Sequence, residues 1–368
     1  MELNVTYQSF LTLLRAGLWN REPESDCFPL SPEVWQRVYK LACKQTVEGI
    51  VYDGILRLPE HYFPPKQLLL NWVVRVYSIE ERNKQVNEIA CDKYDFFKMH
   101  HMQAFLMKGQ GVAICYENPL HRMCGDIDLS FQDKKDFNRA CRLVKENKIV
   151  IAKQAGFSAC YTWKGVFIEL HQFFLDISNP FLSHYLHRLQ QQENDNSIFF
   201  EMNGRQVLLP SPVLTHLSVN THILRHLLSF GISIRQLCDS ARVYCMYHNS
   251  IDRQSLKEIY SKLHIYRWIQ LLNSILVKYL GMPEEYLPFP LKPKQSADWM
   301  MKDILQSGSF GYFGGPFSKE TDEPQLNRKH VWLHLSVRFF RYVRYAPYEA
   351  CWFPIMHTYS HFKNWITK

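Results

Sequence analysis

The sequence lacks the features that mark membrane-spanning and secreted proteins. It contains no uninterrupted apolar run of about 18 residues, the length that crosses a bilayer. No signal-peptide pattern is present near the start, because Glu2 and further polar residues interrupt the early apolar positions. The ten cysteines are scattered singly, without a Cys-x-x-Cys pair. This usage is typical of reduced core cysteines rather than a disulfide scaffold, and we therefore expect a cytoplasmic protein without a membrane span.

Composition sets broad limits on the fold and the partners. With 368 residues the chain is too long for one small core, and two or three packed units are expected. Aromatic residues make up 14%, so large side chains should fill these cores. The formal net charge of +8 permits a polyanionic partner such as a nucleotide, RNA or an acidic surface, but does not require one. No internal repeat is evident, and no Gly-Lys-Ser/Thr phosphate loop follows the glycines at 308–315.

The first hundred residues follow helical spacing. Ser31 and Pro32 are typical of an N-cap and a first helical position, and apolar residues recur at helical intervals after them. The pair Pro64-Pro65 breaks the pattern, and a long helix is predicted over residues 66–100.

The middle of the chain mixes strand and helix patterns. Strands are predicted at 105–107, 126–131, 157–162 and 166–173, with a short helix at 112–116, a helix at 134–147 and a hairpin turn at Lys164-Gly165. A polar connection is expected at 190–196, and a second hairpin, 198–202 with 206–209, flanks Asn203-Gly204. The remainder is mainly helical, with a loop at 308–324. We predict an α+β fold, a small mixed sheet at 104–210 between helical regions at 1–103 and 211–368.

Two carboxylates on one predicted strand form the centre of a candidate site. Asp126 and Asp128 lie two residues apart and therefore point to the same face of the strand. Ile127 and Leu129 point the other way, into a core. Two adjacent carboxylates repel each other, and a hard divalent cation such as Mg²⁺ relieves that repulsion because it prefers oxygen ligands.

A third acid completes the pattern of a two-metal phosphoryl-transfer site. Glu169 lies on the later strand Phe167-Ile-Glu-Leu-His171, and His171 shares its face. An Asp-x-Asp pair alone is common on exposed strands. The order of the elements is more informative: a strand into a glycine turn, an Asp-x-Asp strand and a third acidic strand.

These segments resemble the uncharacterised nucleotidyltransferase family of the DNA polymerase β-like superfamily. The resemblance is carried by Phe105-Leu-Met-Lys-Gly-Gln-Gly-Val-Ala, Tyr116-Glu-Asn-Pro119, Arg122-Met-Cys-Gly-Asp-Ile-Asp-Leu and Glu169-Leu-His171. A weaker match extends over His216, His222 and His226 to Ile234-Arg-Gln-Leu-Cys-Asp239. The resemblance implies a small mixed sheet bearing the acids. It also implies transfer of a nucleotide from a nucleoside triphosphate such as ATP to an acceptor hydroxyl, with release of pyrophosphate. The acceptor, whether a small molecule, a protein or an RNA end, is left open.

The resemblance also implies roles for individual residues. Asp126, Asp128 and Glu169 would bind Mg²⁺ or Mn²⁺, and Lys108, Gly109 and Gln110 would form the turn beside the triphosphate. The wider superfamily has Gly-Ser at this turn, so Gln110 stands at the usual serine position. That departure favours the alternative of a catalytically inactive nucleotide-binding or protein-interaction module, whereas the three intact acids favour an enzyme.

Several residues keep two interpretations. Lys108 would bind phosphate or be solvated, and Arg122 would grip phosphate or pair with Asp126 or another core acid. His171 would orient an acid or be an ordinary strand histidine. His222 and His226 are four residues apart on a predicted helix, and packing or a place in the acceptor pocket is favoured over zinc binding. Asp239 is expected to form a local cap or bridge. A basic aromatic helix with Arg338, Arg341 and Arg344 would pack in the core or meet RNA or a membrane surface.

Overall fold

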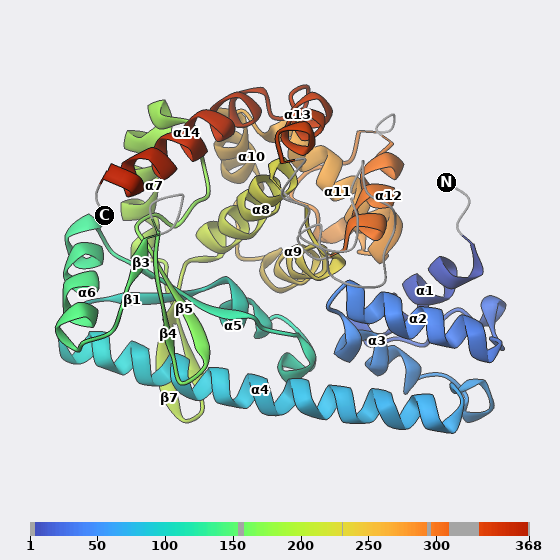
Figure 1. The fold of residues 1–368 in the computed structure, drawn as a ribbon. Coiled ribbons are helices and arrows are strands. Elements are labelled where there is room, and N and C mark those ends of the chain that lie inside the picture. Colours follow the sequence, from blue (N-terminus) through green and yellow to red (C-terminus); the bar gives the residue numbers. More distant parts are fainter. Residues whose placement is uncertain (1–3, 154–157, 230, 293–295, 309–330, 367–368) are drawn as a thin grey trace.

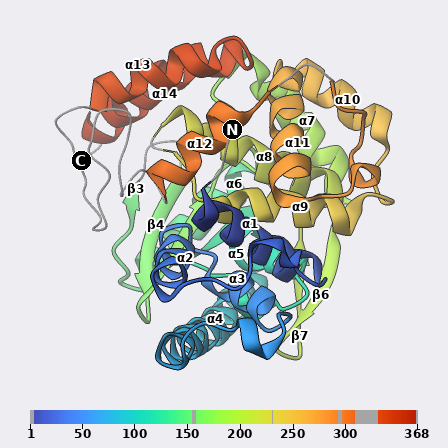
Figure 2. The same cartoon turned by 90° about the vertical axis from the view of Figure 1, so that its right-hand side faces the viewer.

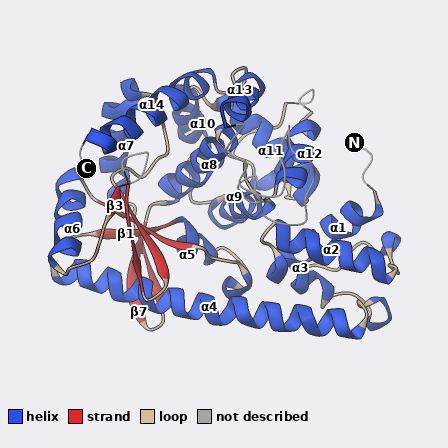
Figure 3. Ribbon diagram, viewed as in Figure 1, coloured by secondary structure: helices blue, strands red, loops and turns tan. Residues whose placement is uncertain are grey.

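The structure is a computed structural model that describes residues 4–153, 158–229, 231–292, 296–308 and 331–366. The strands gather at one end of the molecule and helices make up the rest (Figure 3). Buried apolar side chains from the N-terminal, central and C-terminal regions belong to one hydrophobic cluster. The predicted α+β class is confirmed, and the three predicted regions share this core.

The N-terminal region is a bundle of helices that ends in one long helix, as Figure 1 shows. Gly17 and Gly54 let α1 and α3 touch, because a Cβ at Gly17 would lie 1.8 Å from the Ile50 carbonyl oxygen. The Ser31 side chain caps α2 as predicted, accepting from the Val34 amide at 3.4 Å. The helices are α1 (Val5–Trp19), α2 (Pro32–Lys44), α3 (Glu48–Ile55) and α4 (Lys66–Met99).

Helix α4 confirms the long helix expected from Lys66 onward. Its 34 residues span about 50 Å and pass along the sheet and the N-terminal bundle (Figures 1 and 2). The buried Asn83 side chain donates to the carbonyls of Leu120 at 2.6 Å and Arg122 at 2.9 Å. This helix therefore fixes the segment that leads into the Asp126 strand.

The central sheet has five strands in the order β1-β2-β5-β4-β3. Strands β2 and β5 are parallel, and the other neighbours are antiparallel. The predicted hairpin is present, with Lys164 and Gly165 in the left-handed conformation at its turn. The strands are β1 (Ala104–Met107), β2 (Asp126–Phe131), β3 (Ala152–Lys153), β4 (Ser158–Trp163) and β5 (Val166–His171).

The elements around the sheet depart from prediction at three places. The short helix starts earlier than expected, as α5 (Lys108–Ala113), and strand β3 was not predicted. The connection expected at 190–196 is exposed at four of its seven residues, but its first part is helical because α7 (Ser183–Asn194) extends into it. Gln190 is buried there and donates to the Phe131 carbonyl at 3.2 Å, so its polarity serves an internal hydrogen bond. Helix α6 (Lys134–Glu146) and the hairpin β6 (Ile198–Met202) and β7 (Arg205–Leu209) agree with prediction.

The C-terminal region is helical and closes over the sheet and the first helices. Gln45, which caps the C-terminus of α2, links these regions by donating to the Ile304 carbonyl at 3.0 Å and accepting from the Ile234 amide at 2.8 Å. Its helices are α8 (Pro212–Leu228), α9 (Ile234–Tyr247), α10 (Arg253–Lys262), α11 (Tyr266–Leu280), α12 (Asp298–Ser307), α13 (Val331–Tyr342) and α14 (Pro347–Ile366). Apart from Gly308, most of the loop predicted at 308–324 lies outside the described residues.

The basic aromatic helix α13 packs into the molecule. Arg338 is fully buried and pairs with Asp303, and Arg341 reaches the same carboxylate at 2.8 Å. The guanidinium of Arg344 lies 5.1 Å from the Tyr345 ring centre. This arrangement supports the packed interpretation over an RNA or membrane surface.

The structure also bears on the cysteines and on membrane-spanning helices. All ten cysteines are free thiols. Within the part of the chain that the structure describes, no helix has the length and apolarity needed to cross a bilayer.

Candidate active site

The predicted acids lie side by side on the two parallel strands at the centre of the sheet. Asp128 of β2 is paired in register with Glu169 of β5, and Asp126 is two residues earlier on the same face as Asp128. All three line one cavity of about 150 Å³. Among the described residues, ligand atoms of Asp128, Glu169 and His171 come within 4.8 Å of one another. The strand period therefore predicts that these acids lie together, and His171 lies beside them as expected from its shared face.

His171 is in contact with two of the acids. Its Nε2 lies 2.6 Å from Asp128 Oδ1 and 3.8 Å from Glu169 Oε2. The Ser158 hydroxyl of β4 donates to the other oxygen of Glu169. Both acids are thus oriented by neighbours on the same sheet, which supports the interpretation of His171 as a positioning residue.

The two aspartates of β2 carry opposite pKa shifts. Burial, reinforced by the nearby negative charge of Asp128, raises the pKa of Asp126 to about 6. Burial alone would also raise the pKa of Asp128, but Lys108 and His171 outweigh it and hold that pKa below its usual range. The charge of Asp128 is therefore balanced by Lys108 and His171. For Asp126, burial and the charge of Asp128 outweigh the attraction of Arg235.

Lys108 is buried and paired, not solvated at the end of a strand. Its Nζ lies 3.3 Å from Asp176 Oδ2 and 4.0 Å from Asp128 Oδ1. Burial alone would lower the pKa of Lys108, but the attraction of Asp176 and Asp128 raises it overall, so the ammonium stays charged. The residue has a positive φ of 35°, a conformation that costs energy in a side-chain-bearing residue and is found at functional sites.

Asp176 is a fourth acid, largely enclosed, that the sequence did not reveal. It lies in the connection after β5 and binds three cationic or ionisable groups: Lys108, His222 Nδ1 at 2.9 Å, and Arg225. Burial would raise the pKa of Asp176, but Lys108 and Arg225 outweigh it and hold that pKa well below its usual range. No motif surrounds Asp176 in the chain, and only its spatial partners identify it.

The glycine turn approaches the Asp126 strand closely. Gly109 has φ 30° and ψ −115°, and a Cβ there would lie 3.1 Å from the Asp126 carbonyl oxygen. Gly109 lines the cavity with Lys108. Gln110 turns away instead, and its Nε2 donates to Asn87 Oδ1 of α4 at 2.6 Å and the Asn83 carbonyl at 3.3 Å. The residue at the usual serine position therefore anchors α5 to α4.

Arg122 holds a core acid. Its Nε and Nη2 donate to the two carboxylate oxygens of Asp239, both at 2.7 Å, and both side chains are buried. Tyr116 donates to the same carboxylate at 2.7 Å. This geometry favours the core-acid interpretation of Arg122, although the residue also lines the cavity. The partner is 117 residues away, so the local bridge predicted for Asp239 is wrong.

Helices α8 and α9 form the wall that faces the acids. The rings of His222 and His226 of α8 meet edge to face with centres 4.3 Å apart, and burial lowers the pKa of both. Both histidines line the cavity. Arg235 of α9 lines it too and is positioned by the Met123 carbonyl at 3.0 Å and Thr46 Oγ1 at 3.1 Å. Sequence reasoning did not single out Arg235.

Comparison with known proteins gives one family. Residues 31–281, well over half of the chain, match the family described as uncharacterised nucleotidyltransferase. No curated protein matches the sequence. One solved structure is similar, an antigenic nucleotidyltransferase-like protein from Paracoccidioides brasiliensis, at 18% identity and a TM-score of 0.32, over 54% of this chain and 92% of that one. On the family match, this chain belongs to the uncharacterised nucleotidyltransferases.

Proposed function

We propose that this protein transfers a nucleotidyl group from a nucleoside triphosphate to an acceptor hydroxyl, using two divalent cations held by Asp126, Asp128 and Glu169. Membership of the family supports nucleotidyl transfer in general. The single observation that carries the specific proposal is the cavity itself. Three carboxylates from adjacent strands face a helical wall that bears basic side chains.

The donor set fits Mg²⁺ or Mn²⁺. Carboxylate oxygens are the ligands that these ions prefer, and the pKa of Asp126 is raised first by burial and then by the neighbouring charge of Asp128. When bound, the ions would neutralise the triphosphate and the departing pyrophosphate and polarise the acceptor hydroxyl. His171 and Ser158 would hold Asp128 and Glu169 in place for this role.

The phosphate end of the site would be basic and glycine-lined. Lys108 and Arg235 place positive charge in the cavity, and Gly109 lets the turn approach phosphate closely. We propose that Lys108 exchanges its contact with Asp128 for a phosphate oxygen when nucleotide binds. The acceptor oxygen then attacks the α-phosphorus, the bond from that phosphorus to the β-phosphate oxygen breaks, and pyrophosphate leaves in line. The hydroxyl proton passes to solvent.

Each of the three regions would have its own role in the proposed reaction. We propose that residues 104–210 form the catalytic core, with 1–103 supporting it from behind through α4. Residues 211–368 would supply the opposite wall of the cavity through α8 and α9.

Binding of nucleotide and metal is the first test. Thermal melting with each of ATP, GTP, CTP and UTP should show stabilisation that requires Mg²⁺ or Mn²⁺ and disappears in Asp128→Asn. Asp26→Asn removes an exposed carboxylate in the N-terminal region, outside the residues that line the cavity, and should behave as wild type.

Transfer is the second test. With α-³²P-labelled nucleotide and a cell extract, wild type should label an acceptor and Asp128→Asn should label it at least about a thousand-fold less, since losing about 4 kcal/mol of transition-state stabilisation lowers a rate by that factor. Equal labelling by both proteins would reject the metal site, and stabilisation without any transfer would favour an inactive nucleotide-binding module.

A further inference from the structure

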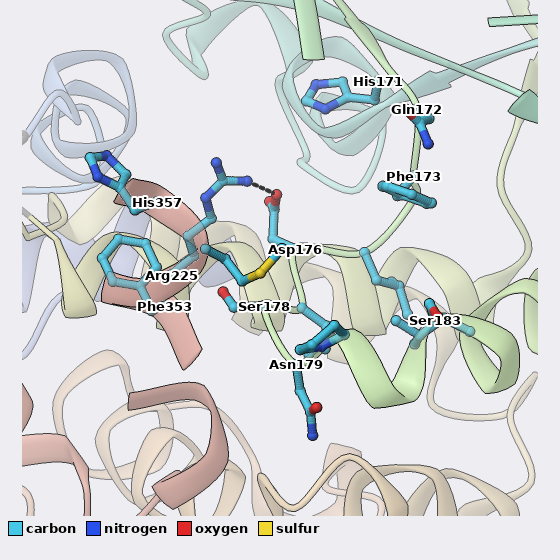
Figure 4. Close-up of a pocket in the computed structure, with 15 residues that line it drawn as sticks. His171, Gln172, Phe173, Asp176, Ser178, Asn179, Ser183, Arg225, Phe353 and His357 are labelled. Carbon is cyan, nitrogen blue, oxygen red and sulfur yellow. Dashed lines mark hydrogen bonds and ion pairs between the residues drawn. The ribbon is translucent and has the colours of Figure 1, made fainter. Parts of the chain in front are cut away.

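A second cavity adjoins the carboxylates. It has a volume of about 220 Å³ and is drawn in Figure 4. Its walls come from the connection after β5, from α7, from α8 through Arg225, and from α14 through Phe353, Met356 and His357. In the figure, Phe353 and His357 lie on one side, Phe173 and Ser183 on the other, and Asp176 between them.

His171 and Asp176 separate this cavity from the one that contains the acids. Both residues line the second cavity. On the other side, His171 is bonded to Asp128, and Asp176 is bonded to Lys108 and His222. A molecule in the second cavity would therefore lie one side chain away from Asp128 and Glu169.

The lining differs in chemistry from that of the carboxylate cavity. Seven of its residues are apolar: Phe173, Leu175, Ile177, Pro180, Leu186, Phe353 and Met356. Hydroxyl and amide groups of Ser178, Asn179 and Ser183 are interspersed. No lysine lines it, and its one arginine, Arg225, is paired with Asp176. Such a lining suits a small molecule with an apolar body and a few polar groups, and it is poor for a polyphosphate or an RNA backbone.

The cavity is held open by a specific contact between two distant segments. Glu349, in the first turn of α14, accepts from the backbone amides of Ser178 at 2.8 Å and Asn179 at 3.2 Å. Its side chain is buried, so the pair of bonds fixes α14 against the connection after β5. Helix α14 lies beyond residues 31–281, the part that matches the family. Part of the wall of this cavity thus lies outside the matched residues.

We propose that the second cavity binds the acceptor, a small hydroxyl compound with an apolar, preferably aromatic, body and no phosphate group. This inference rests on the proposed nucleotidyl transfer. In-line displacement puts the acceptor oxygen and the leaving pyrophosphate on opposite sides of the α-phosphorus. Lys108, Gly109 and Arg235 make the carboxylate cavity the phosphate side, so the acceptor belongs on the side of Glu169 and His171. The product would be a phosphodiester of that hydroxyl, with pyrophosphate as the other product.

Binding of a simple probe tests the cavity. Benzyl alcohol should give saturation-transfer NMR signals with the full-length wild-type protein. Met356→Trp, which fills the cavity from α14, should reduce these signals at least about fivefold, and Ser183→Trp should do the same from α7. Met246→Trp is the matched control, since Met246 is 52% exposed on α9. Equal signals in the filled and control variants would overturn the proposal.

Nucleotide binding separates the two proposals. Stabilisation by Mg²⁺ and nucleotide should be unchanged in Met356→Trp and Ser183→Trp, while labelling of the small-molecule fraction of an extract falls at least about tenfold. If adenosine displaces benzyl alcohol, the cavity holds the nucleobase and the acceptor assignment fails. If no nucleotide stabilises wild type, the proposed function fails, whatever benzyl alcohol does. Labelling only of RNA or protein would reject the small-molecule class.

Discussion

The two walls of the carboxylate cavity have opposite charge and different origins in the chain. The sheet wall carries Asp126, Asp128 and Glu169, which lie within 43 positions of one another on two neighbouring strands. The helical wall carries histidines and Arg235 from α8 and α9. An acidic wall suits cations and a basic wall suits phosphate, so the space between them suits a metal–triphosphate complex.

The walls also differ in how their charges are balanced. Asp239 behind the helical wall is neutralised by a bidentate arginine, and its pKa is lowered because Arg122 outweighs the effect of burial. Asp126 on the sheet wall has its pKa raised by burial and by the charge of Asp128, against a smaller opposing effect of Arg235. The first arrangement should stabilise the fold, whereas the second should cost stability unless a bound cation neutralises the charge. Substitutions on each wall should therefore change different properties.

Breaking the structural pair should have the largest effect on stability. Arg122→Met leaves Asp239 buried without its partner, and the free energy of unfolding should fall by about 3–5 kcal/mol. The measurement is urea unfolding followed by circular dichroism. Arg205→Met is the matched control, because Arg205 pairs with acids at a more exposed site and its loss should change stability little. A similar loss in both variants would contradict the distinction between the pairs.

Removing charge from the helical wall should affect nucleotide affinity. Arg235→Met deletes a charged donor at the cavity, worth about 1.5–3 kcal/mol in hydrogen bonding, so nucleotide should bind about 10- to 100-fold more weakly. Isothermal titration with Mg²⁺ and the preferred nucleotide measures this. Arg253→Met, at an exposed site on α10, should leave affinity unchanged. Unaltered affinity in Arg235→Met would remove this residue from the phosphate end.

Removing charge from the sheet wall should stabilise the protein while disabling it. Asp126→Asn relieves repulsion with Asp128 and Glu169, and the free energy of unfolding in EDTA at pH 8 should rise by about 1–2 kcal/mol. The same substitution should weaken the stabilisation by Mn²⁺ and nucleotide. A loss of stability in EDTA would show instead that Asp126 is held by favourable contacts.

The sheet wall could be predicted from the sequence because its information is local. Alternation along residues 126–131 places Asp126 and Asp128 on one face, and the parallel β2–β5 register brings Glu169 opposite Asp128. Lys108 and Gly109 directly follow strand β1. For the same reason the resemblance to the family rests on this segment, and the family match confirms it.

The helical wall and its partners could not be predicted, because they depend on contacts across the chain. Asp176 meets Lys108 68 positions away and Arg225 49 positions away, and no spacing rule connects them. Polarity was misleading for Gln190, which is buried in a helix, and for Gln110, which binds α4. In each case packing of distant segments decides where a polar side chain points.

The smallest expected effect concerns His216 of α8 and the dependence of stability on pH. Burial lowers the pKa of His216 to about 4, from an ordinary value of 6.5. Between these values the unfolded chain binds a proton that the folded protein does not. Stability is therefore lost as the pH falls below about 6.5, by about 1 kcal/mol at pH 5.5 for this residue.

Urea unfolding of wild type and His216→Gln at pH 7.5 and pH 5.5 measures the contribution of His216. The difference between the two pH values should be about 1 kcal/mol smaller in His216→Gln, whatever that variant costs in absolute stability. His61→Gln, at an exposed position, should keep the wild-type difference. An unchanged pH dependence in His216→Gln would mean that burial does not lower the pKa of His216 in the folded protein.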